Sequence, residues 1–371
     1  MNTIDIIVSG HLCLDLLPRM AHVPLAALSS PGRLFEVGAL DYATGGSVSN
    51  TGLALRQLGL NVRLMALVGE DLIGQAVISL LRARDAALTE QIIAQPGYPT
   101  SYTIVLAPER VDRIFLHCTG TNDVFGAANV DFALLPQARL FHLGYPPLLP
   151  QLYAEDGTQL ETIYRQAYAT GVITSLDMAL PDPDGPSGQA DWVRIFERTL
   201  PYLDIFLPSI EEIIYALRKP DFLAWRGNLK SFLTAQYLSH LADEILAGGA
   251  AVVGFKLGEL GLYLKTGRRD RLERLRRLGI APDEWADREI YAPAFEVEVV
   301  GTTGAGDSAY AGFLAAALRG LSPEEAVRWS CAVGACNVEA ADATSGVRTW
   351  EATSARLAAG WNTRTERLAG A

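Results

Sequence analysis

Apolar and polar positions along the chain form two alternating patterns. Short apolar runs predict buried strands, and stretches with apolar residues three or four positions apart predict helices. The runs lie at 4–9, 61–68, 138–143, 172–177, 203–207, 251–255, 261–264 and 295–300. The helical stretches lie at about 50–58, 71–81, 151–169, 190–199, 209–217, 228–247, 306–319 and 323–341. This order predicts an α/β fold with a mostly parallel central sheet and helices on both faces.

Two further segments depart from this pattern. Residues 102–106 and 113–117 alternate between polar and apolar around a turn at 108–110, which predicts two half-exposed strands. Residues 16–44 are interrupted by several prolines and glycines, and we interpret them as irregular. The chain shows no internal repeat, so we interpret 1–371 as one large domain.

Composition and charge exclude several classes of function. The 371 residues are 49% hydrophobic, enough for a large core. The net charge of -11 argues against nucleic acid as a partner. The four cysteines lack metal-ligand spacing, and no apolar run is long enough to span a membrane. The first residues lack the basic start of a signal peptide, so we expect a cytoplasmic protein with no membrane partner.

The stretch 299–309 carries the clearest chemical signal. An apolar run, a Gly- and Thr-rich loop and a helix start direct backbone N–H groups toward one small volume, which favours anion binding. A dinucleotide fingerprint needs a second strand with an acidic residue further on, and none follows. A P-loop needs a lysine where Asp307 stands. In the remaining interpretation the amides stabilise a phosphoryl group and Asp307 accepts a proton from the attacking hydroxyl. An ordinary glycine-rich turn is the alternative.

Candidate ligand contacts occur near the N-terminus. Asp15 follows the first strand, where open α/β sheets bind ligands, although a turn-capping carboxylate would look the same. Gly45 and Gly46 allow close approach of a ligand, and Asn50 can donate and accept hydrogen bonds; a plain turn at a helix start is the alternative. Asp71 suits a helix N-terminus and is assigned a structural role.

Later candidates are more ambiguous. Ser209 and Glu212 form a capping box, which by itself explains both residues. Lys256 begins a glycine-rich turn and could reach a phosphate, or belong to an ordinary hairpin. Asp177 ends a strand and is either a cleft residue or a cap. Asn337 lies on a helix of small residues, where a buried core amide is equally expected.

The segment 302–307 resembles the signature of the ribokinase-like sugar kinases, the PfkB family, written Asp-Thr-x-Gly-Ala-Gly-Asp. Six of the seven positions match, and Gly301 replaces the first aspartate. The Gly45-Gly46 to Asn50 pattern and the step from Gly69 to Asp71 also resemble family motifs, in the same order. Ser209 departs from the Asn-x-x-Glu motif that the family places there.

The resemblance implies a ribokinase-like fold with a small β-sheet lid, built from about 11–44 and 97–120, over a bound sugar. It implies ATP and Mg²⁺ as cofactors and permits a homodimer through the lid. It assigns catalysis to Asp307, Gly304, Ala305 and Gly306. It assigns sugar contacts to Asp15, Gly45, Gly46, Asn50 and Asp307. It assigns nucleotide contacts to Lys256, Gly258, Gly261, Thr303, Gly306 and Asn337, and Mg²⁺ to Glu212 through water.

These features predict an ATP-dependent sugar kinase; a nucleoside kinase and a non-catalytic sugar-binding regulator are the alternatives. We expect weak or no potassium activation, because Gly301 supplies no side-chain oxygen. Residues 266–290 form an insertion near the predicted nucleotide site, with leucines on one helical face and a cluster of arginines. These arginines either lie in solvent or cover ATP. Arg110 and Arg113 on the lid could bind an acidic group of the acceptor.

Overall fold

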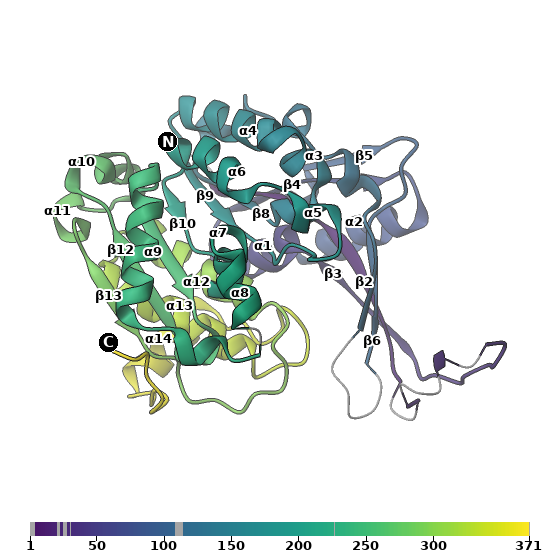
Figure 1. Cartoon of the computed structure of the whole chain (residues 1–371). Coiled ribbons are helices and arrows are strands. Elements are labelled where there is room, and N and C mark those ends of the chain that lie inside the picture. Colours follow the sequence, from purple (N-terminus) through teal and green to yellow (C-terminus); the bar gives the residue numbers. More distant parts are fainter. Residues whose placement is uncertain are drawn as a thin grey trace.

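The fold was analysed in a computed structural model of the chain, which describes residues 4–20, 23–24, 28–29, 31–107, 114–225 and 227–370. Its centre is a nine-stranded sheet in the order β13-β12-β11-β10-β9-β8-β1-β4-β5 (Figure 1). The strands from β11 to β5 in this order run parallel, and β12 is antiparallel to both of its neighbours. The bounds are β1 (Ile4–Gly10), β4 (Val62–Gly69), β5 (Gln91–Gln95), β8 (Ala138–Gly144), β9 (Ile173–Asp177), β10 (Ile205–Phe206), β11 (Val252–Lys256), β12 (Leu262–Thr266) and β13 (Glu289–Ala292).

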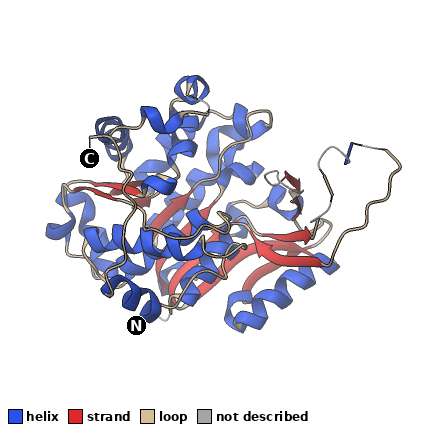
Figure 2. Ribbon diagram, turned by 90° about the horizontal axis from the view of Figure 1, so that it is seen from below, coloured by secondary structure: helices blue, strands red, loops and turns tan. Residues whose placement is uncertain are grey.

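Helices cover both faces of this sheet, as the alternating pattern predicted (Figure 2). One apolar cluster joins the strands to α1 (Ser47–Gln57), α2 (Leu72–Arg84), α12 (Ala305–Leu318) and α13 (Pro323–Asn337). A second cluster joins the other face to α4 (Thr158–Ala169), α6 (Trp192–Thr199), α7 (Ile210–Leu217) and α9 (Ala235–Gly248). The remaining helices are α3 (Pro150–Tyr153), α5 (Pro186–Gln189), α8 (Lys219–Ala224), α10 (Arg269–Leu272), α11 (Pro282–Trp285) and α14 (Trp350–Ala358). No helix in the described part of the chain is long and apolar enough to cross a membrane.

A second, four-stranded sheet projects from one end of the molecule (Figure 1). Its order is β3-β2-β6-β7, with bounds β2 (Cys13–Pro18), β3 (Leu40–Gly45), β6 (Tyr102–Leu106) and β7 (Ile114–Cys118). The predicted hairpin is therefore present, although its turn and Arg113 lie outside the described residues. Residues 16–44 were predicted to be irregular, and this was wrong at both ends of the range, where β2 ends and β3 begins. β2 and β3 pair antiparallel across a long connection, and local sequence patterns do not reveal such pairing.

Several predicted boundaries also differ from the structure. Residues 295–300 do not form a strand; a single bridge joins Phe295 to Thr363, and Val299 and Val300 are exposed. A short apolar run does not show by itself whether its side chains are buried in a sheet or exposed on a loop. The predicted helix at 151–169 is interrupted at 154–157, the one at 228–247 begins at Ala235, and the one at 323–341 ends earlier, at 337.

The basic segment 266–290 lies between β12 and β13, at the edge where the parallel strands begin. Its leucines are buried, as predicted from their spacing. Arg274 forms an ion pair with Asp204 at 3.0 Å and donates to the carbonyl of Val172 at 2.8 Å, both at strand starts. Arg277 donates to the carbonyl of Ala138, where β8 begins. These contacts argue against the hypothesis that the segment covers ATP, because parallel-sheet ligands bind at the opposite, carboxyl edge.

Candidate active site

Polar side chains from distant parts of the chain meet at the carboxyl edge of the central sheet. Tyr145 follows β8, Asp177 ends β9 and Lys256 ends β11. Asp307 lies in the first turn of α12, and Asn50 lies in the first turn of α1. In a parallel sheet, residues at successive carboxyl ends converge in space, and this convergence creates the site.

Asp307 is at the centre of this group and is only 2% exposed. Its carboxylate accepts hydrogen bonds from Asn50 Nδ2 at 3.0 Å and from Thr51 Oγ1 at 3.4 Å. The Tyr145 hydroxyl lies 2.8 Å from each of the two carboxylate oxygens. Burial raises the pKa of Asp307, and the charge of Lys256 and these hydrogen bonds partly oppose the rise. A carboxylate in this position is suited to accept a proton.

The loop before Asp307 brings bare backbone into the site. Gly304 is left-handed, with φ of 70°, and a β-carbon there would lie 2.4 Å from the carbonyl oxygen of Ala343. The N–H of Ala305 donates to Thr302 within the loop at 3.2 Å. Ala305 and Gly306 both line the adjacent cavity. Of the three amides predicted to bind an anion, that of Ala305 is already engaged within the loop.

Lys256 and Asp177 form a buried ion pair beside this loop, with 2.7 Å between Nζ and Oδ1. A β-carbon on Gly306 would lie 3.4 Å from Lys256 Nζ, so the ammonium group faces the glycine-rich helix start. Burial raises the pKa of Asp177 to about 6, although Lys256 opposes the shift. The neighbouring carboxylates hold the pKa of Lys256 above its ordinary value despite burial. The second oxygen of Asp177 has no hydrogen-bond partner among the described residues.

Glu212 lies behind this pair, and its position confirms the predicted capping box. One carboxylate oxygen accepts from the backbone N–H of Ser209 at 2.7 Å. Burial raises the pKa of Glu212 to about 8, and Lys256 opposes this rise. Glu211, rather than Glu212, lines the adjacent cavity.

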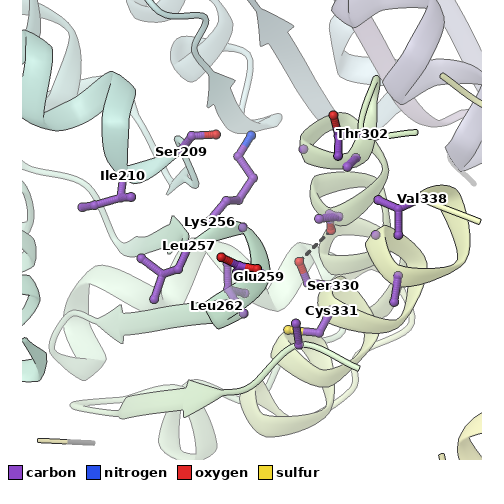
Figure 3. A pocket seen from close by; sticks show the side chains of 18 of the residues that line it. Ser209, Ile210, Lys256, Leu257, Glu259, Leu262, Thr302, Ser330, Cys331 and Val338 are labelled. Atoms are coloured by element: carbon purple, nitrogen blue, oxygen red, sulfur yellow. Dashed lines mark hydrogen bonds between the residues drawn. The ribbon is translucent and has the colours of Figure 1, made fainter. Parts of the chain in front are cut away.

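A cavity of about 730 Å³ adjoins Lys256 and the start of α12 (Figure 3). Gly258 and Gly261, predicted to contact a nucleotide, both line it. Its other walls are mainly apolar and include Leu257, Leu262, Val297, Val299, Ala335 and Val338. Glu259 forms ion pairs with Lys230 and with Arg364 at the cavity wall.

Two residues predicted to contact the nucleotide lie elsewhere. Asn337 is fully buried, and its Nδ2 donates to the carbonyl of Thr303 at 2.9 Å. It thereby holds the loop before Asp307 from behind. Thr302, not Thr303, is the threonine on the cavity wall.

The predicted sugar contacts surround the other side of Asp307. Gly45 lies against Asp15, since a β-carbon there would be 2.2 Å from the Asp15 carboxylate. Gly46 lies against His11 in the same way, at 2.5 Å from Nδ1. The His11 ring is 6.1 Å from the ring of Tyr145, which contacts Asp307. A series of contacts therefore links the small sheet to the Asp307 carboxylate. Burial lowers the pKa of His11 to about 3.

Tyr145 and His11 belong to the site although no sequence pattern marks them as functional residues. Tyr145 has no motif around it, and only its place after an apolar run could have indicated a ligand edge. His11 lies near the predicted contact Asp15 in the sequence, but no motif marks it. Asp177 was considered, but its lysine partner is 79 positions away and could not be inferred.

An open α/β sheet with a glycine-rich anion loop, a buried carboxylate and an adjoining cavity is the architecture of a phosphotransferase. Residues 5–350 match the pfkB family carbohydrate kinases, and the chain belongs to that family. It is 27% identical over 332 residues to a 2-dehydro-3-deoxygluconokinase of Bacillus subtilis, covering 88% of this chain and 90% of that one.

Solved structures share the fold. An Arabidopsis thaliana ribokinase complexed with ribose and ATP has a TM-score of 0.71 at 17% identity, with 95% of this chain and 98% of that one covered. An Escherichia coli protein described as a putative ribokinase II, in complex with ATP and Mg²⁺, has a TM-score of 0.69 at 17% identity, with coverage of 96% and 99%. The ribokinase-like fold predicted from the sequence is thus confirmed.

Proposed function

We propose that this carbohydrate kinase transfers the γ-phosphoryl group of MgATP to a hydroxyl of a sugar, with Asp307 as the general base. The observation that carries the proposal is the position of Asp307, buried in the first turn of α12 between a cavity and a set of polar groups. Asp307 accepts the proton of the attacking hydroxyl, and the Gly306 amide stabilises the charge that develops on the phosphoryl group. We extend the same role to the Gly304 amide, and to the Ala305 amide once it exchanges its hydrogen bond to the Thr302 carbonyl for one to the phosphoryl group.

The cavity beside Lys256 fits a nucleotide. Its apolar walls suit a base, while Lys256 and Gly306 lie at the end next to Asp307, where phosphates belong. Gly258 and Gly261 bring backbone to the same wall. Among the described residues, no cluster of three His, Cys, Asp or Glu side chains is arranged to hold a metal directly. We propose that Glu212 acts on Mg²⁺ through water, because its carboxyl group lies close to Lys256 and Asp177 but does not itself line the cavity; when bound, Mg²⁺ would neutralise phosphate charge.

We propose that the acceptor lies between Asp15, Gly45, Gly46 and Asn50, under the four-stranded sheet acting as a lid. Asp15 and Asn50 offer hydrogen-bond acceptors and donors for sugar hydroxyls, and the glycines allow close approach. Because a relative is a 2-dehydro-3-deoxygluconokinase, 2-dehydro-3-deoxygluconate is the first acceptor to test. Ribose, fructose and nucleosides complete the panel.

We also propose that two copies pair through the four-stranded sheet. Leu40, Tyr42, Phe115 and Leu116 are apolar residues exposed on its strands. Apolar side chains grouped on one projecting sheet favour association. Sedimentation velocity should therefore detect a dimer, and a Tyr42→Glu variant should shift it toward the monomer.

The proposed function is tested by coupling ADP release to a spectrophotometric signal across the acceptor panel. We expect one acceptor to support turnover and to raise the melting temperature in thermal shift, because a ligand stabilises the state that binds it. An acceptor that stabilises the protein but is not phosphorylated with MgATP would instead identify a non-catalytic regulator.

A further inference from the structure

Tyr145 has an unusual backbone conformation for its residue type. Its φ of 65° and ψ of 46° are left-handed, although it is not glycine and it precedes Pro146. Such a conformation is unfavourable for a bulky residue, and it persists only where surrounding contacts enforce it. Here the Tyr145 N–H donates to the carbonyl of Asp177 at 3.2 Å, and its carbonyl accepts from Leu148 at 2.9 Å. The chain is thus bent immediately after β8 in a way that directs the ring into the site.

Among the described residues, the hydroxyl at the end of this ring hydrogen-bonds to Asp307 and to no other group. It lies at 2.8 Å from both carboxylate oxygens, a symmetric arrangement that fixes the rotation of the carboxylate. Asn50 approaches one oxygen and Thr51 approaches the other, at the longer distance of 3.4 Å. Tyr145 therefore makes the shortest hydrogen bonds to the Asp307 carboxylate, and among the described residues it is the only one that contacts both oxygens.

We propose that Tyr145 is a positioning residue for phosphoryl transfer, whose hydroxyl holds the Asp307 carboxylate ionised and correctly oriented toward the acceptor hydroxyl. This inference rests on the proposed role of Asp307 as general base. A donor to a carboxylate stabilises its charged form more than its protonated form. A fixed carboxylate also avoids the loss of rate that accompanies a misplaced base.

Charged groups near Asp307 also affect its ionisation, in addition to Tyr145. Lys256, on β11, favours the ionised carboxylate. Asp177, on β9, and Glu212, on α7, are also close enough to interact electrostatically with these groups. Lys256 is also paired with Asp177. Among the uncharged donors to Asp307, the Tyr145 hydroxyl most strongly opposes the rise in the pKa of Asp307 that burial causes.

The test is Tyr145→Phe, which removes one oxygen and keeps the ring. Tyr164→Phe is the matched control, because the Tyr164 hydroxyl donates to the carbonyl of Ser175 in the core and makes no contact with Asp307. For Tyr145→Phe we expect the acid limb of kcat/KM to move up by about one pH unit, and plateau kcat to fall about 10-fold. The KM for ATP should not change, and Tyr164→Phe should change only the melting temperature.

Each outcome either supports or overturns the positioning role of Tyr145. An acid limb that does not move overturns the proposal, and a lower kcat with an unmoved limb would show instead that Tyr145 contacts the acceptor. A melting temperature below that of Tyr164→Phe, with an unchanged pH profile, would indicate a purely structural residue. If Asp307→Asn retains activity, the proposed base fails; if Asp307→Asn is inactive and Tyr145→Phe behaves as wild type, only the present inference fails.

Discussion

Replacing Asp307 by asparagine should separate activity from stability. The change is nearly isosteric, but an amide cannot accept the proton of the acceptor hydroxyl. We expect kcat to fall by about 10²–10⁴-fold, equivalent to about 2.7–5.4 kcal/mol of transition-state stabilisation. The fold should be retained, with a melting temperature equal to or above that of the wild type.

Two structural features predict this retained stability. Burial raises the pKa of Asp307, which means that the folded protein holds the ionised carboxylate at a cost. In addition, Asn50 Oδ1 is buried without a hydrogen-bond partner among the described residues. After rotation of the Asn50 amide, this oxygen can accept from the new amide at 307, while the Tyr145 hydroxyl still has an oxygen to bind.

Asp204→Asn provides a control with the opposite expectation. Asp204 is as buried as Asp307, but it lies at the amino edge of the sheet and pairs with Arg274 at 3.0 Å. It also accepts from the backbone N–H of Thr174 at 2.9 Å. Loss of this pair should cost about 2 kcal/mol, below the value for a fully buried pair because Arg274 is partly exposed. The melting temperature should fall by about 4 °C, with kcat/KM unchanged.

The assays are initial rates with saturating MgATP and the best acceptor, and thermal unfolding of the same preparations without ligands. Near wild-type turnover of Asp307→Asn would refute the role of Asp307 as base. A fall in its melting temperature as large as that of Asp204→Asn would refute the argument that the site carboxylate is held at a cost in stability.

Two further predictions concern the ions of the site. Lys256→Met should lower kcat/KM for ATP by about 100-fold or more, because the cation nearest to Gly306 is lost. Adding Asp177→Asn should restore melting temperature but not activity, since it removes the buried carboxylate left unpaired; recovered activity would contradict the role of Lys256. Rates in potassium, sodium and tetramethylammonium chloride should agree within about twofold, because Gly301 offers no side-chain ligand. A potassium-specific rise would overturn this expectation.

The fold was predictable from the sequence where the signal is local. Alternating apolar runs and helical stretches correctly indicated the central sheet, and Ser209 and Glu212 form the predicted capping box. Pairing between distant segments was not predictable. β2 and β3 are joined by a long connection. β2 is largely apolar but ends at a proline, and most of β3 is exposed, so β3 does not resemble a buried strand. The run at 295–300 was misassigned for a different reason: it is apolar, yet Val299 and Val300 are exposed and no strand pairs with it beyond the bridge at Phe295 in the described part of the chain.

The site was predictable only where chemistry is carried by contiguous residues. The loop before Asp307 was evident, because glycines and a carboxylate follow one another in the chain. Tyr145 was not, because its role depends on a left-handed bend and on a partner 162 positions away. Asn337 was expected to contact a ligand, yet it supports the loop through Thr303. Residue type alone does not distinguish a buried support from a contact.

The charges of the site give a physical reason for its dependence on these supporting residues. Asp177 and Asp307 are buried and Glu212 is half-buried. These three carboxyl groups interact with one lysine, and their mutual repulsion makes it costly to ionise all of them. One of these groups, Asp307, must nevertheless be ionised to act as a base. It is the one with uncharged side-chain donors. Among the described residues, Asp177 and Glu212 accept instead from the backbone N–H groups of Met178 and Ser209, and Asp177 also from Lys256. On the proposed mechanism, the hydrogen bonds from Tyr145 and Asn50 therefore favour ionisation of Asp307, the carboxylate that acts as the base.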